Sequence, residues 1–242
     1  MIVQACLNGA RPRGFHQALP LTSEELAADA AACVAAGAAE LHVHPRDRDG
    51  RESLDATAIG AAIAALRRRL PGTAVGVSTG DWITGDDARR RVAIATWTER
   101  PDYASVNLGE ADAPAVMALL LEQGIGIEAG LAGPADAERL VACGLGPRCW
   151  RMLIEMPDGD AGDALARAVA TAAVLDRAGL CRPRLLHGFD ATVWPVLRQA
   201  AAMRFSTRIG LEDGKALPDG RIAPDNAVLV RAAVAIMRPG AA

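Results

Sequence analysis

The sequence has almost no lysine and no long apolar run, and both absences restrict what the protein can do. Lys215 is the only lysine among 26 basic residues. Schiff-base chemistry, which requires a desolvated lysine, therefore has almost no candidate residue. No apolar stretch reaches the roughly 20 residues needed to cross a bilayer, and the N-terminus lacks the basic region and apolar segment of a signal peptide. We therefore expect no membrane partner.

Neither the charge nor the cysteine content indicates a specialised partner. The formal net charge of -3 gives no electrostatic reason to expect nucleic acid or an anionic membrane surface as a partner. The five cysteines are scattered, odd in number, and never form a Cys-x-x-Cys pair. Reduced, mostly buried thiols in a cytoplasmic protein are the expected state.

Strand-like apolar runs alternate with alanine-rich helical stretches, with no linker that would mark a domain boundary. The expected strands cover residues 2–7, 39–44, 73–78, 102–107, 125–129, 149–154, 183–188 and 205–210. A capping box of Thr22 and Glu25 indicates where the first helix begins. The later helices are expected at residues 55–70, 85–97, 112–123, 134–143, 160–179, 191–202 and 225–237. This alternation predicts an α/β fold, a single (β/α)8 TIM-barrel domain over residues 1–242.

A doubly wound open sheet is the alternative fold for alternating strands and helices. Such a sheet usually carries a Gly-x-Gly-x-x-Gly loop after its first strand. Residues 8–14, which follow the first expected strand, read Asn-Gly-Ala-Arg-Pro-Arg-Gly and lack that spacing. The barrel is therefore the favoured fold.

Two of the four histidines, His42 and His44, end the second expected strand. Side chains two apart on a strand point to the same side, so both imidazoles face one point, at the end of the barrel where catalysis occurs. They could bind a divalent metal, or be surface or hydrogen-bonded histidines. A catalytic zinc site takes three protein ligands. Glu212, after the eighth strand, is the preferred third ligand and His187 the alternative, although Glu212 could also belong to a loop carboxylate pair or a cap.

Other polar or small residues occur near the ends of the expected strands. Arg208, in an apolar stretch of the eighth strand, needs a carboxylate or an anionic ligand if it faces inward. The stretch from Ser78 to Gly80 could bind a ligand or form only a turn. Further strand-end candidates for binding substrate are Ser105, Asn107 and Glu128.

Five segments, taken in order along the chain, resemble the β-keto acid cleavage enzymes, the family typified by 3-keto-5-aminohexanoate cleavage enzyme. They are residues 8–10, 19–25, 42–47, 77–80 and 208–213. Each segment alone is a weak signal, whereas the ordered set is specific. The resemblance implies a zinc-dependent barrel, an acyltransferase that converts a β-keto acid and acetyl-CoA into acetoacetate and a new acyl-CoA.

The resemblance also implies roles for individual residues. The ligands of zinc, or of another divalent metal, would be His42, His44 and Glu212. The catalytic pair would be Arg208 and Asp213. The substrate would be held at Ser78, Ser105 and Asn107, to which we add Gly80 and Glu128 as strand-end neighbours. A homo-oligomer is expected, with the family's tetramer as its form.

Two positions depart from the family pattern, and one of them is Gly214, which replaces the asparagine that commonly follows the Glu-Asp pair. Arg11 stands where the typifying enzyme has an acidic residue that meets the amino group of its substrate. Arg11 therefore predicts a substrate with a neutral or anionic side chain. Two other functions remain as alternatives. A metal-dependent barrel hydrolase would take further histidines from middle strands, but none occurs between residues 45 and 186. A non-catalytic metal- or ligand-binding barrel is the second alternative.

Overall fold

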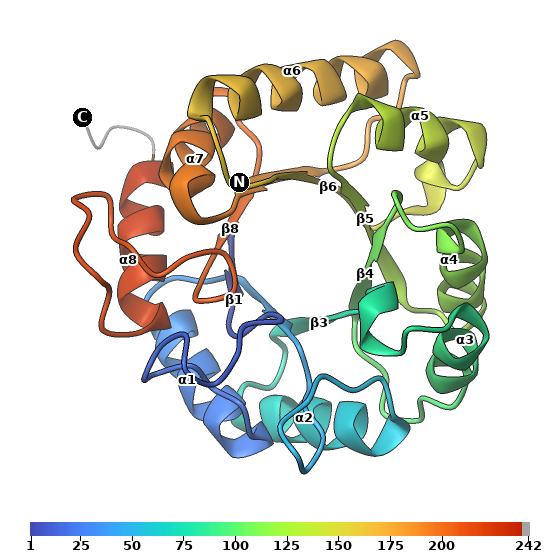
Figure 1. The fold of residues 1–242 in the computed structure, drawn as a ribbon, viewed down its shortest axis with the longest axis vertical. Coiled ribbons are helices and arrows are strands. Elements are labelled where there is room, and N and C mark those ends of the chain that lie inside the picture. Colours follow the sequence, from blue (N-terminus) through green and yellow to red (C-terminus); the bar gives the residue numbers. More distant parts are fainter. Residues whose placement is uncertain (239–242) are drawn as a thin grey trace.

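A computed structural model describes residues 1–238 of the protein, within which eight strands alternate with eight α-helices (Figure 1). The strands are β1 (Val3–Cys6), β2 (Glu40–Val43), β3 (Ala74–Ser78), β4 (Tyr103–Asn107), β5 (Gly126–Leu131), β6 (Arg151–Met156), β7 (Arg184–Gly188) and β8 (Thr207–Ile209). The helices are α1 (Ser23–Ala35), α2 (Ala56–Arg69), α3 (Asp87–Ala95), α4 (Ala113–Glu122), α5 (Pro134–Ala142), α6 (Ala161–Arg177), α7 (Val193–Ala202) and α8 (Asn226–Met237). Three short 3-10 turns are η1 (Asp81–Ile83), η2 (Gly146–Arg148) and η3 (Asp190–Thr192).

The strands form one parallel sheet that curves into a nearly closed barrel. Its order is β7-β6-β5-β4-β3-β2-β1-β8. A bridge between Leu185 and Ser206, with a 2.9 Å hydrogen bond from the amide of Leu186 to the carbonyl of Ser206, links the two edges. The helices surround the ring of strands (Figure 1). The predicted (β/α)8 barrel is confirmed.

The two faces of each strand have different environments, because side chains alternate along a strand. In β2, Leu41 and Val43 are fully buried in the apolar layer between the strands and the helices. The intervening His42 and the following His44 point into the barrel mouth and line a cavity there. The alternation that buries the apolar residues thus also places the two histidines together.

The element boundaries differ from the sequence-based prediction by at most two residues. The largest functional consequence concerns β6, which continues through Glu155 to Met156 instead of ending at residue 154. The sequence-based prediction ended this strand just before Glu155 because the residue is acidic. An inward position near the barrel mouth accepts such a polar side chain, so the strand continues. Along residues 1–238, no helix combines the length and the apolarity required to cross a membrane.

Candidate active site

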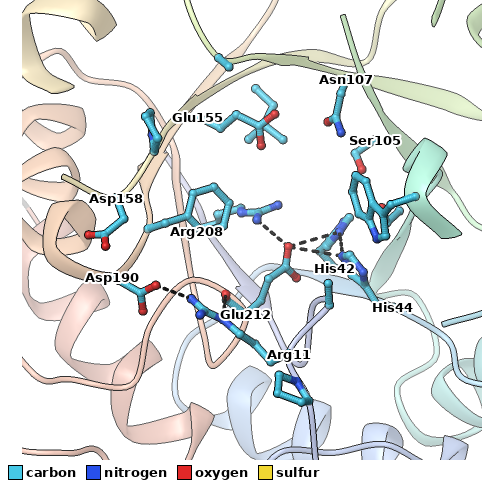
Figure 2. A pocket seen from close by; sticks show the side chains of 18 residues that line it. Arg11, His42, His44, Ser105, Asn107, Glu155, Asp158, Asp190, Arg208 and Glu212 are labelled. Carbon is cyan, nitrogen blue, oxygen red and sulfur yellow. Dashed lines mark hydrogen bonds and ion pairs between the residues drawn. The ribbon is translucent and has the colours of Figure 1, made fainter. Parts of the chain in front are cut away.

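A cavity of about 700 Å³ opens at the carboxyl ends of the strands (Figure 2). Its wall includes residues from the ends of several different strands and from the loops that follow them. His42 and His44 lie on one side, and Arg208 and Glu155 lie across from them (Figure 2). A cavity at this end of a TIM barrel is the usual location of the active site.

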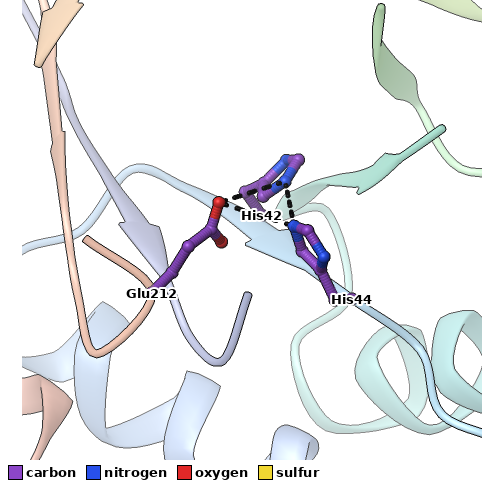
Figure 3. Close-up of side chains that lie close together, drawn as sticks. All are labelled: His42, His44 and Glu212. Atoms are coloured by element: carbon purple, nitrogen blue, oxygen red, sulfur yellow. Dashed lines mark hydrogen bonds and ion pairs between the residues drawn. The ribbon is translucent and has the colours of Figure 1, made fainter. Parts of the chain in front are cut away.

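The side chains of His42, His44 and Glu212 converge on one point (Figure 3). The two Nε2 atoms are 3.2 Å apart. Glu212 Oε1 lies 3.4 Å from Nε2 of His44 and 3.8 Å from Nε2 of His42. All three residues are buried, and one donor atom of each lies within 4.8 Å of the other two. This geometry brings together the three residues that the sequence pattern singled out.

The backbone around the three residues explains how they meet. Gly9 has a left-handed φ of 55°, and a Cβ atom at this position would lie 2.4 Å from Cγ of Glu212. Only glycine therefore lets the Glu212 side chain pass the end of β1. Asn8 fixes the other side: its amide nitrogen donates to the carbonyl of His44 (2.8 Å), and its oxygen accepts from the amide of His44 (2.9 Å).

The charge of Glu212 and the neutral ring of His42 suit a divalent cation. Burial would lower the pKa of His44, but Glu212 and Glu52 outweigh it and raise that pKa to about 9, so a metal would have to displace the proton of that ring. Burial raises the pKa of Glu212, but Arg208, His44 and His42 outweigh it and hold that pKa well below its usual value. Burial lowers the pKa of His42 well below its usual value. Two imidazole nitrogens and one ionised carboxylate form a donor set that zinc and several other divalent metals accept. Glu212 Oε2 has no hydrogen-bond partner among residues 1–238, so this oxygen is available to bind a metal. The residues therefore fit a metal.

A second group of ionisable residues lies beside the three converging side chains. Arg208 Nη2 donates to Oε1 of Glu212 (2.6 Å) and to Oδ1 of Asp213 (2.9 Å). Burial alone would lower the pKa of Arg208, but Asp213 and the other nearby acidic groups raise it well above its usual value. Arg208 lines the cavity, whereas Asp213 is fully buried behind it. The inward guanidinium thus has the carboxylate partners that its burial requires.

His187, the alternative third ligand, lies away from the point where His42 and His44 converge. Its Nδ1 is 3.3 Å from Oδ1 of Asp213, and its Nε2 is 3.7 Å from Oε2 of Glu155. Burial and Arg208 lower the pKa of His187, but Asp213 and Glu155 raise it above its usual value. Among the residues that the structure describes, the one group with metal-binding geometry contains Glu212 and not His187.

The predicted substrate-binding residues fall into two sets. Ser78 and Ser105 are register partners on β3 and β4, and both line the cavity together with Asn107. Glu128 and Gly80 are absent from the cavity wall formed by residues 1–238. Glu128 is fully buried, accepts a 3.1 Å hydrogen bond from Gln4 and lies 2.8 Å from Nε of Arg151. Glu128 lies within β5 and points into the barrel, below the cavity and not at the strand end where the sequence analysis placed it.

Gly80 acts through a neighbour rather than through the cavity itself. A Cβ atom at Gly80 would lie 2.1 Å from the indole ring of Trp82. Trp82 is half exposed and lines the cavity. The glycine therefore provides the space in which this aromatic wall packs.

Comparison with known proteins connects this arrangement to a family. A sequence profile of the beta-keto acid cleavage enzymes matches residues 1–240. The chain belongs to the beta-keto acid cleavage enzyme family. This membership confirms the resemblance seen in the five sequence segments.

Two relatives from named organisms are similar in sequence to about half of this chain. The 3-keto-5-aminohexanoate cleavage enzyme of Fusobacterium nucleatum is 33% identical over 110 residues, which cover 45% of this chain and 39% of the relative. The 3-oxoadipate:acetyl-CoA acetyltransferase of Cupriavidus necator is 29% identical over 114 residues, 47% of this chain and 39% of the relative. The matched stretch thus spans about two fifths of the length of each relative.

Solved structures share the fold of this family member at low sequence identity. The ternary complex of ObcA with a C4-CoA adduct and oxalate superposes with a TM-score of 0.70 at 18% identity, covering 88% of this chain and 62% of that chain. The 3-dehydroquinate dehydratase of Geobacillus kaustophilus gives a TM-score of 0.60 at 12% identity, covering 95% of this chain and 89% of that chain. These likenesses establish the barrel fold.

In this beta-keto acid cleavage enzyme family member, Arg11 lines the cavity but is already paired. Its Nη2 lies 2.8 Å from a carboxylate oxygen of Asp190, and its Nε donates to the carbonyl of Glu212 (3.0 Å). Asp190 has a φ of 45°, which is uncommon for a residue other than glycine. Arg11 therefore joins the loops after β1, β7 and β8 (Figure 2).

The sequence interpretation missed several residues of the site. Trp82, Glu155, Asp158 and Asp190 line the cavity, and Glu52 contacts His44 from outside it. Glu155 and Asp190 follow the sixth and seventh expected strands, but an acidic residue at a strand end carries no further motif that would mark it. Glu52, Trp82 and Asp158 lie in loops without a recognisable motif, so the sequence offered no comparable signal.

Proposed function

We propose that the protein is a metal-dependent acyltransferase that condenses a β-keto acid with acetyl-CoA and releases acetoacetate and a new acyl-CoA. The observation that carries the proposal is the convergence of His42, His44 and Glu212 beside the Arg208–Asp213 pair, in a cavity at the catalytic end of the barrel. Family membership and the acetyl-CoA acetyltransferase name of one relative support the reaction class.

The metal, for which zinc is our first choice, would be held by the two Nε2 atoms and by the carboxylate of Glu212. When bound, it supplies Lewis-acid stabilisation of the negative charge that develops on the keto oxygen. The three protein ligands leave coordination positions for the substrate, as catalytic zinc sites do.

The cavity wall beside the two histidines, formed by the neighbouring strands β3 and β4, would orient the substrate. Ser78 and Ser105 present hydroxyl groups from adjacent strands, and Asn107 adds an amide. These groups can hydrogen-bond the carboxylate of a β-keto acid and hold its central carbon in one place.

Asp213 would act as the base, oriented by Arg208. Arg208 occupies Oδ1 of Asp213, while Oδ2 has no hydrogen-bond partner in the described part of the chain. Asp213 Oδ2, which is buried behind Arg208, would take a proton from the carbon between the two carbonyls once bound substrate has moved the Arg208 side chain aside. The resulting carbanion attacks the acetyl thioester and expels the CoA thiolate. That thiolate then attacks the keto carbon, the bond to the central carbon breaks, and the proton returns to give acetoacetate and the new acyl-CoA.

The distal part of the substrate would meet Arg11. Two nitrogens of Arg11 already donate hydrogen bonds, to Asp190 and to backbone carbonyls. A carboxylate on the substrate side chain would therefore compete with Asp190 for the guanidinium. We therefore propose neutral or anionic side chains, with the neutral ones favoured by this pairing.

A metal analysis combined with an activity assay tests the proposal. Acetoacetate and acyl-CoA formation is measured from acetyl-CoA and a panel of β-keto acids, with and without a chelator. We expect turnover that the chelator abolishes and the metal restores. His42→Ala should remove both the metal and the activity, whereas His16→Ala, a control at a buried histidine outside the cavity, should retain the metal.

Three results would contradict the proposal. Stoichiometric metal retained in His42→Ala would show that the ligand assignment is wrong. Metal binding without acyl-CoA formation from any keto acid would reject the cleavage reaction and favour a binding barrel. Hydrolysis of acetyl-CoA that the chelator abolishes, without formation of a new acyl-CoA, would favour a hydrolase.

A further inference from the structure

Glu52 contacts both a metal-ligand residue and the cavity wall, although it belongs to neither set. It lies in the loop after β2, with its side chain 11% exposed. Its Oε1 is 2.6 Å from Nδ1 of His44. Its Oε2 accepts a 3.1 Å hydrogen bond from Nε1 of Trp82, which lines the cavity. One carboxylate thus joins His44 to an aromatic residue at the cavity mouth.

The contact with His44 determines which nitrogen faces the metal point. A neutral imidazole has one N–H and one lone pair. A carboxylate beside Nδ1 takes the N–H, so the lone pair is left on Nε2, which faces His42 and Glu212. A carboxylate in this position also makes the ring a more basic ligand.

The two histidines differ in the hydrogen-bond partners that hold their rings. Nδ1 of His42 has no hydrogen-bond partner anywhere in residues 1–238. His44 is held twice, at its backbone by Asn8 and at its ring by Glu52. The ring orientation of His44 is therefore set by a side chain that can be changed without touching a ligand.

The contact with Trp82 has a separate consequence. The indole is half exposed, so packing alone restrains it weakly. Gly80 provides space against its ring, and Glu52 fixes its N–H end. A loss of Glu52 would therefore release this part of the cavity wall.

We propose that Glu52 is a positioning residue that presents Nε2 of His44 to the metal and, through its second oxygen, holds Trp82 at the wall of the substrate cavity. The inference rests on the metal site proposed above. It assigns two effects to one carboxylate, and the two effects can be measured separately.

Metal affinity tests the first effect. The full-length chain is titrated with Zn²⁺ against a competing chelator, and the absorption spectrum of the Co²⁺-substituted protein is recorded. Glu52→Ala should weaken metal binding about 10- to 100-fold and shift the Co²⁺ spectrum. Glu52→Gln, which keeps the shape and one acceptor oxygen, should recover part of the affinity. Glu122→Gln, at the exposed end of α4, is the matched control and should bind metal as the wild type does.

Trp82→Phe tests the second effect. It keeps an aromatic ring but removes the N–H that Glu52 accepts. We expect unchanged Zn²⁺ affinity and Co²⁺ spectrum, with an increased KM for the keto acid. Glu52→Ala should show the same increase in KM at saturating metal. If the KM values of both variants equal that of the wild type, the proposed role at the cavity wall is wrong.

The outcomes separate this inference from the proposed function. If the wild type binds no divalent metal, or if His42→Ala retains it, the proposed metal site and this inference are both overturned. If the wild type binds metal and His42→Ala loses it, but Glu52→Ala and Glu52→Gln keep the wild-type affinity and Co²⁺ spectrum, Glu52 does not position His44.

Discussion

Two layers of buried or half-buried polar side chains lie in the interior of the barrel, and they differ in what they contact. The upper layer comprises His42, His44, Glu155, His187, Arg208, Glu212 and Asp213. The lower layer comprises Gln4, Glu40, Tyr103, Glu128 and Arg151. Most of the upper layer borders the cavity, whereas no member of the lower layer does within the residues that the structure describes.

In the lower layer the charged side chains pair with one another, although Oε2 of Glu128 and Nε of Arg151 have no hydrogen-bond partner within residues 1–238. Arg151 lies between Glu128 and Glu40 and is bonded to both. Gln4 donates to the hydroxyl of Tyr103 (2.8 Å), and that hydroxyl donates to the carbonyl of Leu41 (2.7 Å). These contacts join β1, β2, β4, β5 and β6. The layer therefore serves the barrel itself.

The upper layer contains similar residue types in a different arrangement. Two histidine nitrogens face each other at 3.2 Å, and one oxygen of Glu212 and one of Asp213 lack partners within residues 1–238. Burial and charge alone therefore do not identify the active site, because both layers have them. What distinguishes the upper layer is a set of candidate metal-binding atoms that converge beside a cavity, and on this ground we propose it as the functional layer.

Asp213→Asn is expected to separate the layers most sharply. It keeps the size of the side chain and its contact with Arg208 but removes the base. We expect kcat to fall by about 10²- to 10⁴-fold, with an unchanged metal content by elemental analysis. A stoichiometric loss of metal would place Asp213 in the ligand set instead, and a wild-type kcat would remove it from the mechanism.

Arg151→Met is the corresponding change in the lower layer. It leaves Glu128 and Glu40 in the interior without their cation, which should lower the free energy of unfolding by roughly 3–5 kcal/mol. Urea denaturation measures this loss, with Arg68→Met, an exposed arginine on α2, as the control. The folded fraction should bind metal with wild-type affinity. A variant with wild-type stability but impaired metal binding would show that the two layers act as one.

Asp29 is a third kind of carboxylate, half-buried, with a hydrogen bond but without an arginine partner within residues 1–238. Burial raises its pKa to about 7, although Asn226 at 2.7 Å opposes the shift. Because the pKa is higher in the folded protein, the contribution of Asp29 to stability is complete below about pH 4. That contribution is lost as the pH rises through 7. Asp225, which lies nearby, adds to the same shift.

Asp29→Asn should therefore remove part of the pH dependence of unfolding. The variant keeps an oxygen that accepts from Asn226, so at pH 8 we expect it to be more stable than the wild type by roughly 2–4 kcal/mol. At pH 4 the two proteins should be nearly equal. Urea denaturation from pH 4 to 8 measures the difference, with Glu122→Gln as the control. Parallel curves for variant and wild type would show that Asp29 is ionised normally.

Much of the fold and part of the site could be predicted from the sequence. Period-two alternation placed His42 and His44 on one side of a strand, and closure of the barrel brought Glu212 beside them. The depth of Glu128 could not be predicted, because a strand pattern does not say how far each residue lies from the mouth. Glu52 could not be predicted either: it reaches His44 only because the loop folds back, with Glu52 bridged to Arg46.

Two glycines provide the smallest test of the same comparison. Gly9 and Gly50 both have left-handed φ angles, 55° and 80°. A Cβ atom at Gly9 would meet Glu212, whereas Gly50 has nothing within 4 Å. Alanine at either position should destabilise the protein by about 1–2 kcal/mol, the strain of a left-handed backbone. Only Gly9→Ala should also weaken metal binding, because it displaces a ligand of the upper layer. Equal metal affinity in the two variants would mean that Glu212 can shift without loss, and that its position is not what distinguishes the functional layer.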